Sequence, residues 1–169
     1  MKDASYLVEQ RLYDAVTIAH FNKGKQSVSY RVYVPATEDM LIVEMRMEGE
    51  GTLDGSVRLS LPGVNETVNN PPLERVFPDI RENKVTPDGI FYLSRAFKDS
   101  IDIPTKAAMA LSVTNSQDGK FQLKPGKTVR IICAFSSNFK SKDCVVSVIQ
   151  KVKSCSLKQL KNIQKNHKL

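Results

Sequence analysis

Most of this chain alternates hydrophobic and polar residues with a period of two, which predicts β-strands. The runs that show this pattern are residues 27–34, 40–48, 56–61, 89–97, 107–114, 121–123, 128–136 and 144–152. Glycine-rich residues 49–55 separate the second run from the third and predict a hairpin with a long loop. The run 128–136 is apolar on both faces, which is typical of a central strand.

Two further segments carry apolar residues at helical spacing. Residues 5–21 repeat Val8, Leu12 and Val16 on one stripe, with Ser5 as N-cap and Gly24 beyond the end, so we expect an amphipathic helix there. The last residues of the chain place Leu157, Leu160 and Ile163 on a narrow stripe among lysines. This second pattern predicts a basic C-terminal helix.

Together these patterns predict an all-β fold, mainly an antiparallel β-sandwich or a partly open barrel, with an N-terminal helix and a basic C-terminal helix. At 169 residues the chain is expected to form one β-rich domain over residues 1–153, followed by a basic helical tail over 154–169. The proline-rich residues 62–89 interrupt the pattern and predict an irregular excursion, and long loops of this kind are often functional.

The charge is distributed unevenly along the chain. Residues 120–169 contain 12 Lys and Arg against one acid, a net charge of +11, whereas residues 1–119 carry a net charge of −4. A field of this kind attracts polyanions, either nucleic acid or an anionic membrane surface. Solubility alone is a further explanation of the lysines.

Lysines attract phosphates without reading base sequence, so we expect sequence-tolerant and salt-sensitive binding. In a sandwich, the basic residues at hairpin ends and strand edges could converge on one end of the fold. The rings of Phe121 and Phe139 could stack on single-stranded bases or pack within the protein. The candidate nucleic-acid-binding residues are Lys120, Lys124, Lys127, Arg130, Lys140, Lys142, Lys151, Lys153, Lys158, Lys161, Lys165 and Lys168.

The sequence contains no pattern that is typical of an enzyme. Both His20 and His167 lack a neighbouring catalytic motif, and the glycines around Glu50 join two expected strands rather than preceding a helix. Cys133 and Cys144 lie in apolar runs and are expected to be reduced core residues, and the spacing of the three cysteines does not suggest a metal site. We therefore expect a non-enzymatic protein without a cofactor.

The order of strands resembles that of the plant-virus movement proteins of the thirty-kilodalton superfamily. The residues that carry this resemblance are the expected hairpin MLIVEMRMEGEGTLDGSVRLSL and the later segment AAMALSVTNSQDGKFQLKPGKTVRIICAF, with Gly119 as the downstream glycine. The aspartate that this family has near the end of the second hairpin strand is absent, since the chain reads Leu59-Ser60-Leu61-Pro62. The resemblance implies binding of single-stranded nucleic acid, membrane association and transport of a viral genome between plant cells.

The expected partner is single-stranded nucleic acid, with RNA favoured, and the expected location is the host cytoplasm, in association with membranes or cell junctions. An alternative is a small basic viral matrix protein that self-associates and docks on anionic membrane and nucleocapsid. The basic C-terminal helix suits either partner, because each lysine contributes about 1 kcal/mol of attraction to an anionic lipid surface.

Overall fold

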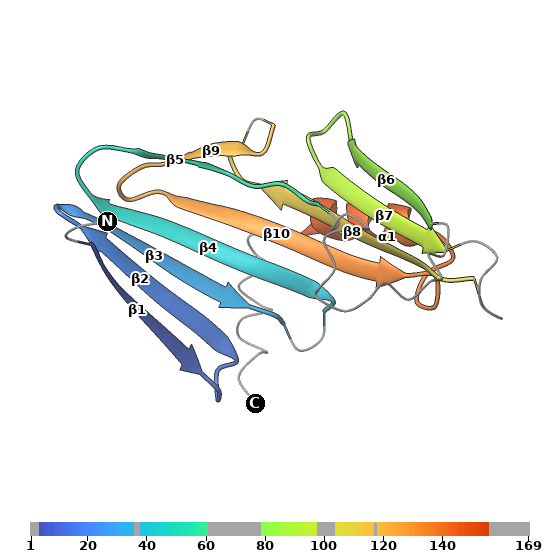
Figure 1. The fold of residues 1–169 in the computed structure, drawn as a ribbon, viewed down its shortest axis with the longest axis horizontal. Helices are drawn as coiled ribbons and strands as arrows, with labels where there is room; N and C mark the ends of the chain where they lie inside the picture. Colours follow the sequence, from blue (N-terminus) through green and yellow to red (C-terminus); the bar gives the residue numbers. More distant parts are fainter. Residues whose placement is uncertain (1–3, 36–37, 61–78, 98–103, 117, 156–169) are drawn as a thin grey trace, which may run out of the picture.

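The computed structural model describes residues 4–35, 38–60, 79–97, 104–116 and 118–155, which form ten β-strands and one α-helix. The strands are β1 (Ala4–Arg11), β2 (Val16–Lys23), β3 (Gln26–Tyr33), β4 (Met40–Gly49), β5 (Leu53–Ser56), β6 (Asp79–Val85), β7 (Phe91–Phe97), β8 (Lys106–Val113), β9 (Lys120–Leu123) and β10 (Thr128–Ser137). The helix is α1 (Cys144–Ser154). This arrangement confirms a mainly β fold (Figure 1).

Eight strands form one antiparallel sheet in the order β1-β2-β3-β4-β10-β8-β7-β6. The sheet is open, because β1 and β6 lie at its two ends and do not pair with each other (Figure 1). Strand β10 lies between β4 and β8 in the middle of the order, as its continuous apolar pattern predicted. The mainly antiparallel β-fold is therefore confirmed, and its large sheet is open.

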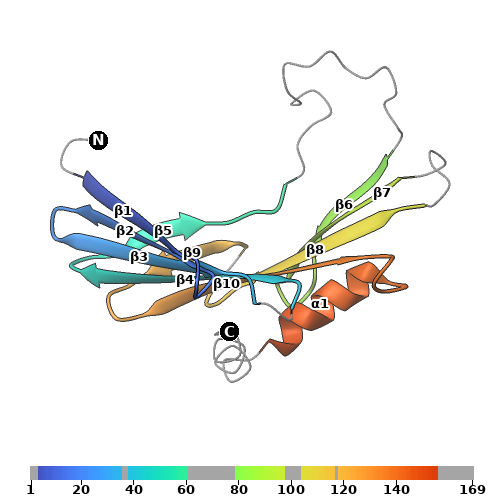
Figure 2. The same cartoon turned by 90° about the horizontal axis from the view of Figure 1, so that it is seen from below.

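The two faces of the sheet are covered by different elements. Helix α1 packs on one face, over β8 and β10, while the small sheet β5–β9 lies on the other (Figure 2). Alternation along β4 divides its side chains between these layers: Met40 and Ile42 pack in the cluster beneath α1, whereas Met45 and Met47 pack with Leu123 of β9. Each face therefore has its own hydrophobic core, which covers only part of the sheet.

The expected N-terminal helix over residues 5–21 is wrong, because these residues form the antiparallel hairpin β1–β2. The chain turns between Leu12 and Ala15, where the Ala15 amide donates to the Leu12 carbonyl at 3.2 Å. The β-branched run that starts at Val16 pairs with β3 as well as β1, and this pairing outweighs the helical spacing of the apolar residues.

The expected strand over residues 144–152 is also wrong, because α1 occupies this segment. Asp143 caps the helix by accepting a hydrogen bond from the Val146 amide at 3.1 Å. The buried residues Cys144, Val148 and Val152 are four apart, which is the spacing of one helix face. Of the expected basic tail, residues 156–169 lie outside the described residues.

The expected hairpin between residues 40–48 and 56–61 is not formed. Strand β4 has β3 on one side and β10 on the other, so neither of its edges is free for another strand. Strand β5 pairs instead with β9, with Leu53 opposite Leu123. The glycine-rich residues after β4 therefore connect the large sheet to the small one.

Candidate nucleic-acid interface

The eight described residues among the predicted site residues do not converge on one end of the fold. Lys120 and Lys124 lie on and just after β9, and Lys127 immediately precedes β10, while Lys140 and Lys142 follow β10. A ten-residue strand spans about 33 Å, so the last two lysines lie far from Lys127. Three further members, Arg130, Lys151 and Lys153, lie on β10 and α1. The expected convergence is wrong.

Acidic residues from the first part of the chain pair with four of these basic residues. Arg130 Nε lies 2.7 Å from Glu44 Oε1, and Lys140 Nζ lies 2.6 Å from Asp39 Oδ2. Lys151 Nζ lies 3.5 Å from Glu38 Oε2, and Lys153 pairs with Asp88. The charge that is segregated along the sequence is therefore partly neutralised in space.

The pairing of Lys140 with Asp39 has an electrostatic consequence. The hydrogen bond from the Lys140 ammonium holds the pKa of the Asp39 carboxyl below its ordinary value. Both side chains are largely exposed, with 63% and 42% of their surface accessible. This lysine is thus engaged within the protein, although water can still compete for it.

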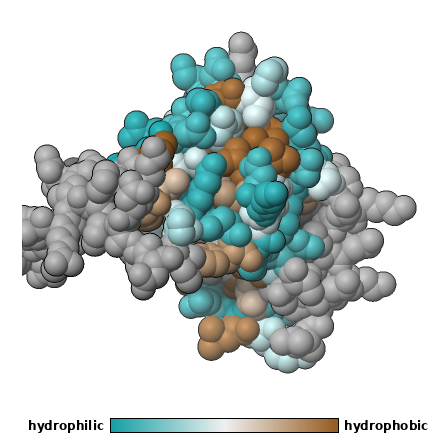
Figure 3. Space-filling view, turned by 90° about the vertical axis from the view of Figure 1, so that its right-hand side faces the viewer, coloured by the Kyte–Doolittle hydropathy of each residue, from teal (hydrophilic) through white to brown (hydrophobic). Residues whose placement is uncertain are grey.

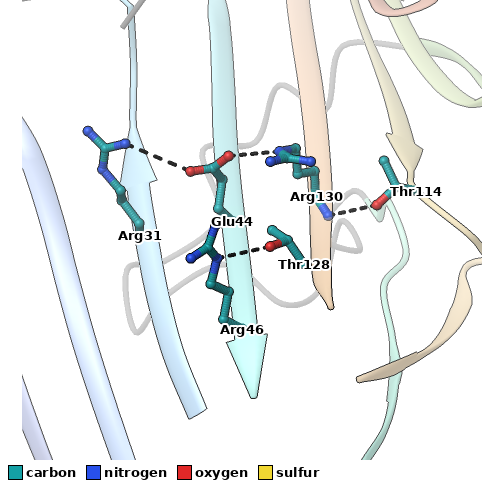
Figure 4. A network of polar contacts seen from close by, with 6 residues as sticks. All are labelled: Arg31, Glu44, Arg46, Thr114, Thr128 and Arg130. Carbon is teal, nitrogen blue, oxygen red and sulfur yellow. Dashed lines mark hydrogen bonds and ion pairs between the residues drawn. The ribbon is translucent and has the colours of Figure 1, made fainter. Parts of the chain in front are cut away.

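Beyond the area that α1 covers, the same face of the sheet becomes polar. Cross-strand neighbours on β3, β4 and β10 form two rows: Arg31, Glu44 and Arg130 in one, and Ser29, Arg46 and Thr128 in the next. On β4 and β10, the residues of these rows are two or four positions from Ile42 and Ile132. Their side chains therefore lie on the same face of the sheet as those two residues. Figure 4 shows the side chains of this surface, which we call the arginine face: Arg31, Glu44, Arg46, Thr114, Thr128 and Arg130.

A single carboxylate lies between two guanidinium groups at the centre of the arginine face. Arg130 Nε donates to Glu44 Oε1 at 2.7 Å, and Arg31 Nη1 lies 3.8 Å from Glu44 Oε2 (Figure 4). The Glu44 and Arg130 side chains are 18% and 22% exposed, which makes this pair partly buried. Opposite charges on adjacent strands stabilise the sheet, so part of the role of this cluster is structural.

Hydrogen bonds to threonines hold the second row and the end of the first. Arg46 Nε donates to Thr128 Oγ1 at 2.9 Å. The Arg130 amide donates to Thr114 Oγ1 at 2.8 Å, and the Thr114 amide donates to the Arg130 carbonyl at 2.9 Å. These contacts fix the guanidinium group of Arg46 and the backbone at Arg130.

Two guanidinium groups retain donors that no described residue accepts. Arg46 uses Nε for Thr128 and directs neither Nη group to a described acceptor. Arg31 makes only the 3.8 Å ion pair and stands over the Tyr33 ring at 5.1 Å, so its N–H groups form no hydrogen bond with the described residues. Guanidinium donors of this kind bind phosphate or carboxylate in a bidentate manner.

Neither Arg31 nor Arg46 was among the predicted site residues, because both precede the basic part of the sequence. The signal that could have found them is the alternation within the strands, which places Arg46 on the polar side of residues 40–48. Of the eight predicted residues that the structure describes, Arg130 alone lies on the arginine face. The side chains of Lys158, Lys161, Lys165 and Lys168 lie outside the described residues.

The aromatic residues that could stack on bases lie in different environments, and two of the cysteines are buried. Phe121 packs against the cluster beneath β5–β9, whereas Phe139 is 64% exposed beside Lys140. Cys133 and Cys144 are buried, and burial raises the pKa of the Cys133 thiol to about 11. Within the described ranges, no three His, Cys, Asp or Glu side chains are grouped to hold a metal ion.

In the described part of the chain, no helix has the length and hydrophobicity needed to cross a bilayer. At the end of the molecule where β7 and β10 finish, hydrophobic patches are separated by hydrophilic surface (Figure 3).

Comparison with models of protein families and with curated proteins finds no match to this sequence.

Proposed function

We propose that this protein binds single-stranded nucleic acid, with RNA favoured, through the arginine face. The observation that carries the proposal is the set of unused donors on Arg31 and Arg46, beside an Arg130 that is neutralised by Glu44. Three guanidinium groups and one carboxylate give the face a net charge of +2. Phosphate is the ligand that this combination of charge and planar donors suits best.

The rigidity of the face supports a role in binding the backbone rather than the bases. The guanidinium groups project from neighbouring strands about 4.8 Å apart, and those of Arg46 and Arg130 are hydrogen-bonded to a cross-strand partner. Contacts to phosphate position a strand without reading its sequence. Exposed Lys124 and Lys127, which form no ion pair with the described residues, would add to the attraction.

The experiment that tests the proposal measures the affinity for a labelled single-stranded RNA at several salt concentrations. Each phosphate contact to a single strand contributes about 0.7 to the slope of log affinity against log salt. Replacing both arginines (Arg31→Gln with Arg46→Gln) should therefore reduce the slope by about 1.4.

A matched control removes the same charge from other exposed positions. Lys23 and Arg58 are exposed and make no ion pair with the described residues, so Lys23→Gln with Arg58→Gln should change the slope much less. Equal effects of the two double variants would show that net charge alone attracts the RNA and that the arginine face is not the site.

Transport of a viral genome between plant cells would be one use of such binding, and it rests on the sequence resemblance alone. The hairpin that carried part of this resemblance is not formed, since β5 pairs with β9. A matrix-like role predicts a different result in the same experiment, namely binding to anionic phosphatidylserine vesicles without binding to RNA. Vesicles should therefore be measured in parallel.

A further inference from the structure

The two edges of the large sheet differ in their chemistry. The outer edge of β6 presents charged residues in its middle, with Arg81, Glu82 and Lys84. Charged side chains of this kind prevent an edge strand from pairing with another chain. Strand β1, at the opposite edge (Figure 1), carries three adjacent apolar residues instead, namely Tyr6, Leu7 and Val8.

Strand β1 is the most accessible strand of the sheet. All eight of its residues are exposed, and within the described chain its outer edge pairs with no other strand. Tyr6, Leu7 and Val8 are 76%, 63% and 54% exposed, although their side chains point alternately to both faces. The strand contains no proline or lysine, and Glu9 pairs with Arg11 at 2.7 Å, which leaves no net charge.

We propose that β1 pairs antiparallel with β1 of a second copy of this chain, which joins the two sheets into one. An exposed edge strand with apolar residues at its centre and no net charge is a template for a further strand, and pairing would satisfy its free backbone groups. A two-fold axis makes the contact self-complementary, so it closes at two copies. The proposal is independent of nucleic-acid binding.

The sequence of β1 favours one register for this contact. If the two-fold axis passes through Leu7, this residue faces its own copy, and Tyr6 faces Val8 of the other chain on the opposite side of the sheet. Tyr6, Leu7 and Val8 then each meet an apolar partner, and no like charges are opposed. An axis through Val8 would instead place Leu7 opposite Glu9 and Tyr6 opposite Gln10.

This geometry has a consequence for the arginine face. A two-fold axis perpendicular to the sheet keeps the corresponding faces of both copies on the same side. The β3 strands of the two copies would then be five strand spacings, or about 24 Å, apart. The dimer would present two arginine faces to the same side.

The test is sedimentation of the full chain without nucleic acid over a range of concentrations. We expect a monomer–dimer equilibrium that reaches twice the 18.9 kDa of one chain. Leu7→Lys should shift the equilibrium to monomer, because two lysines would face each other across the axis. Since Leu7 is 63% exposed, the variant should keep the wild-type circular dichroism spectrum. Val8→Lys provides a second variant on the other face.

Val85→Lys is the matched control, because Val85 is 50% exposed on the opposite edge strand β6. This variant should dimerise like the wild type. A wild-type protein that is monomeric at every concentration would overturn the proposal. Loss of the dimer in Val85→Lys but not in Leu7→Lys, or growth into open filaments, would overturn it as well.

Discussion

Glu44 separates the structural role of the arginine face from its proposed binding role, because its removal should affect the two in opposite directions. In Glu44→Gln, Arg130 and Arg31 lose the carboxylate that lies 2.7 Å and 3.8 Å from them. The fold should become less stable, whereas two guanidinium groups become available to phosphate. We therefore expect a less stable protein that binds RNA more tightly.

The expected loss of stability follows from the exposure of the pair. Exposed ion pairs contribute less than about 1 kcal/mol, and breaking a buried pair costs about 3–5 kcal/mol. Glu44 and Arg130 are 18% and 22% exposed and lie between these limits, so the free energy of unfolding should fall by about 1–2 kcal/mol. Chemical denaturation of both proteins would measure this difference.

The expected gain in affinity follows from counterion release. One additional phosphate contact should steepen the salt slope by about 0.7, which corresponds to about fivefold tighter binding at 0.1 M salt. Fluorescence anisotropy with a labelled single-stranded RNA would measure both quantities.

The control for both measurements is Glu48→Gln, which removes the same charge from the same strand. Glu48 is exposed and makes no ion pair with the described residues, so its replacement should leave stability nearly unchanged and affect affinity only slightly. If Glu44→Gln bound RNA no more tightly than Glu48→Gln, the arginine face would be a structural cluster and the proposed site would be refuted.

Two further predictions concern the core and the loop before α1. Val148 is fully buried between α1 and the sheet, so Val148→Ala should lower the free energy of unfolding by about 2–3 kcal/mol, as measured by denaturant titration. Because Lys140 lowers the pKa of Asp39, their pair stabilises the fold above the ordinary carboxyl pKa of 3.8, and this contribution is lost as pH falls through the lowered value. Melting curves of Lys140→Gln should therefore depend less on pH below about 4 than those of the wild type.

Several strands in the middle of the chain could be predicted from the sequence, whereas the two ends could not. Strand β6 was also missed, because Asp79–Val85 lies within residues 62–89, where an irregular excursion was expected. The runs that became β3, β4, β7 and β8 alternate, and the run that became β10 is apolar on both faces. Each of these strands pairs with strands on both sides. Residues 5–21 fit a helical stripe equally well, and their turn at Leu12–Ala15 contains no glycine or proline. Only the pairing of β2 with β3 decides between the helical spacing and the period of two that is typical of a strand.

In the segment that became α1, the residues favour a strand by propensity, whereas their spacing favours a helix. Its valines and Ile149 have the high strand propensity of β-branched residues, and they led to a predicted strand. The spacing of Cys144, Val148 and Val152 and the cap at Asp143 were helix signals that propensity concealed. Burial of this stripe against β8 and β10 outweighs the local preference.

The candidate site depended on contacts that no local pattern reveals. The sequence segregates its charges, but Glu44 is 86 residues from Arg130, and Asp39 is 101 residues from Lys140. These pairs exist because β4 and β10 are neighbours and because the loop after β10 lies near the start of β4. Strand order must be known before the net charge of a surface can be read.

The central claim is that the arginine face contacts nucleic acid, and side-chain NMR of the arginines tests it most directly. The Nε–Hε resonances of Arg31, Arg46 and Arg130 would be followed as single-stranded RNA is added, with the exposed Arg58 as internal reference. We predict that the three resonances shift and saturate together while that of Arg58 changes little. Unchanged resonances on the arginine face at an RNA concentration that saturates binding would contradict the claim.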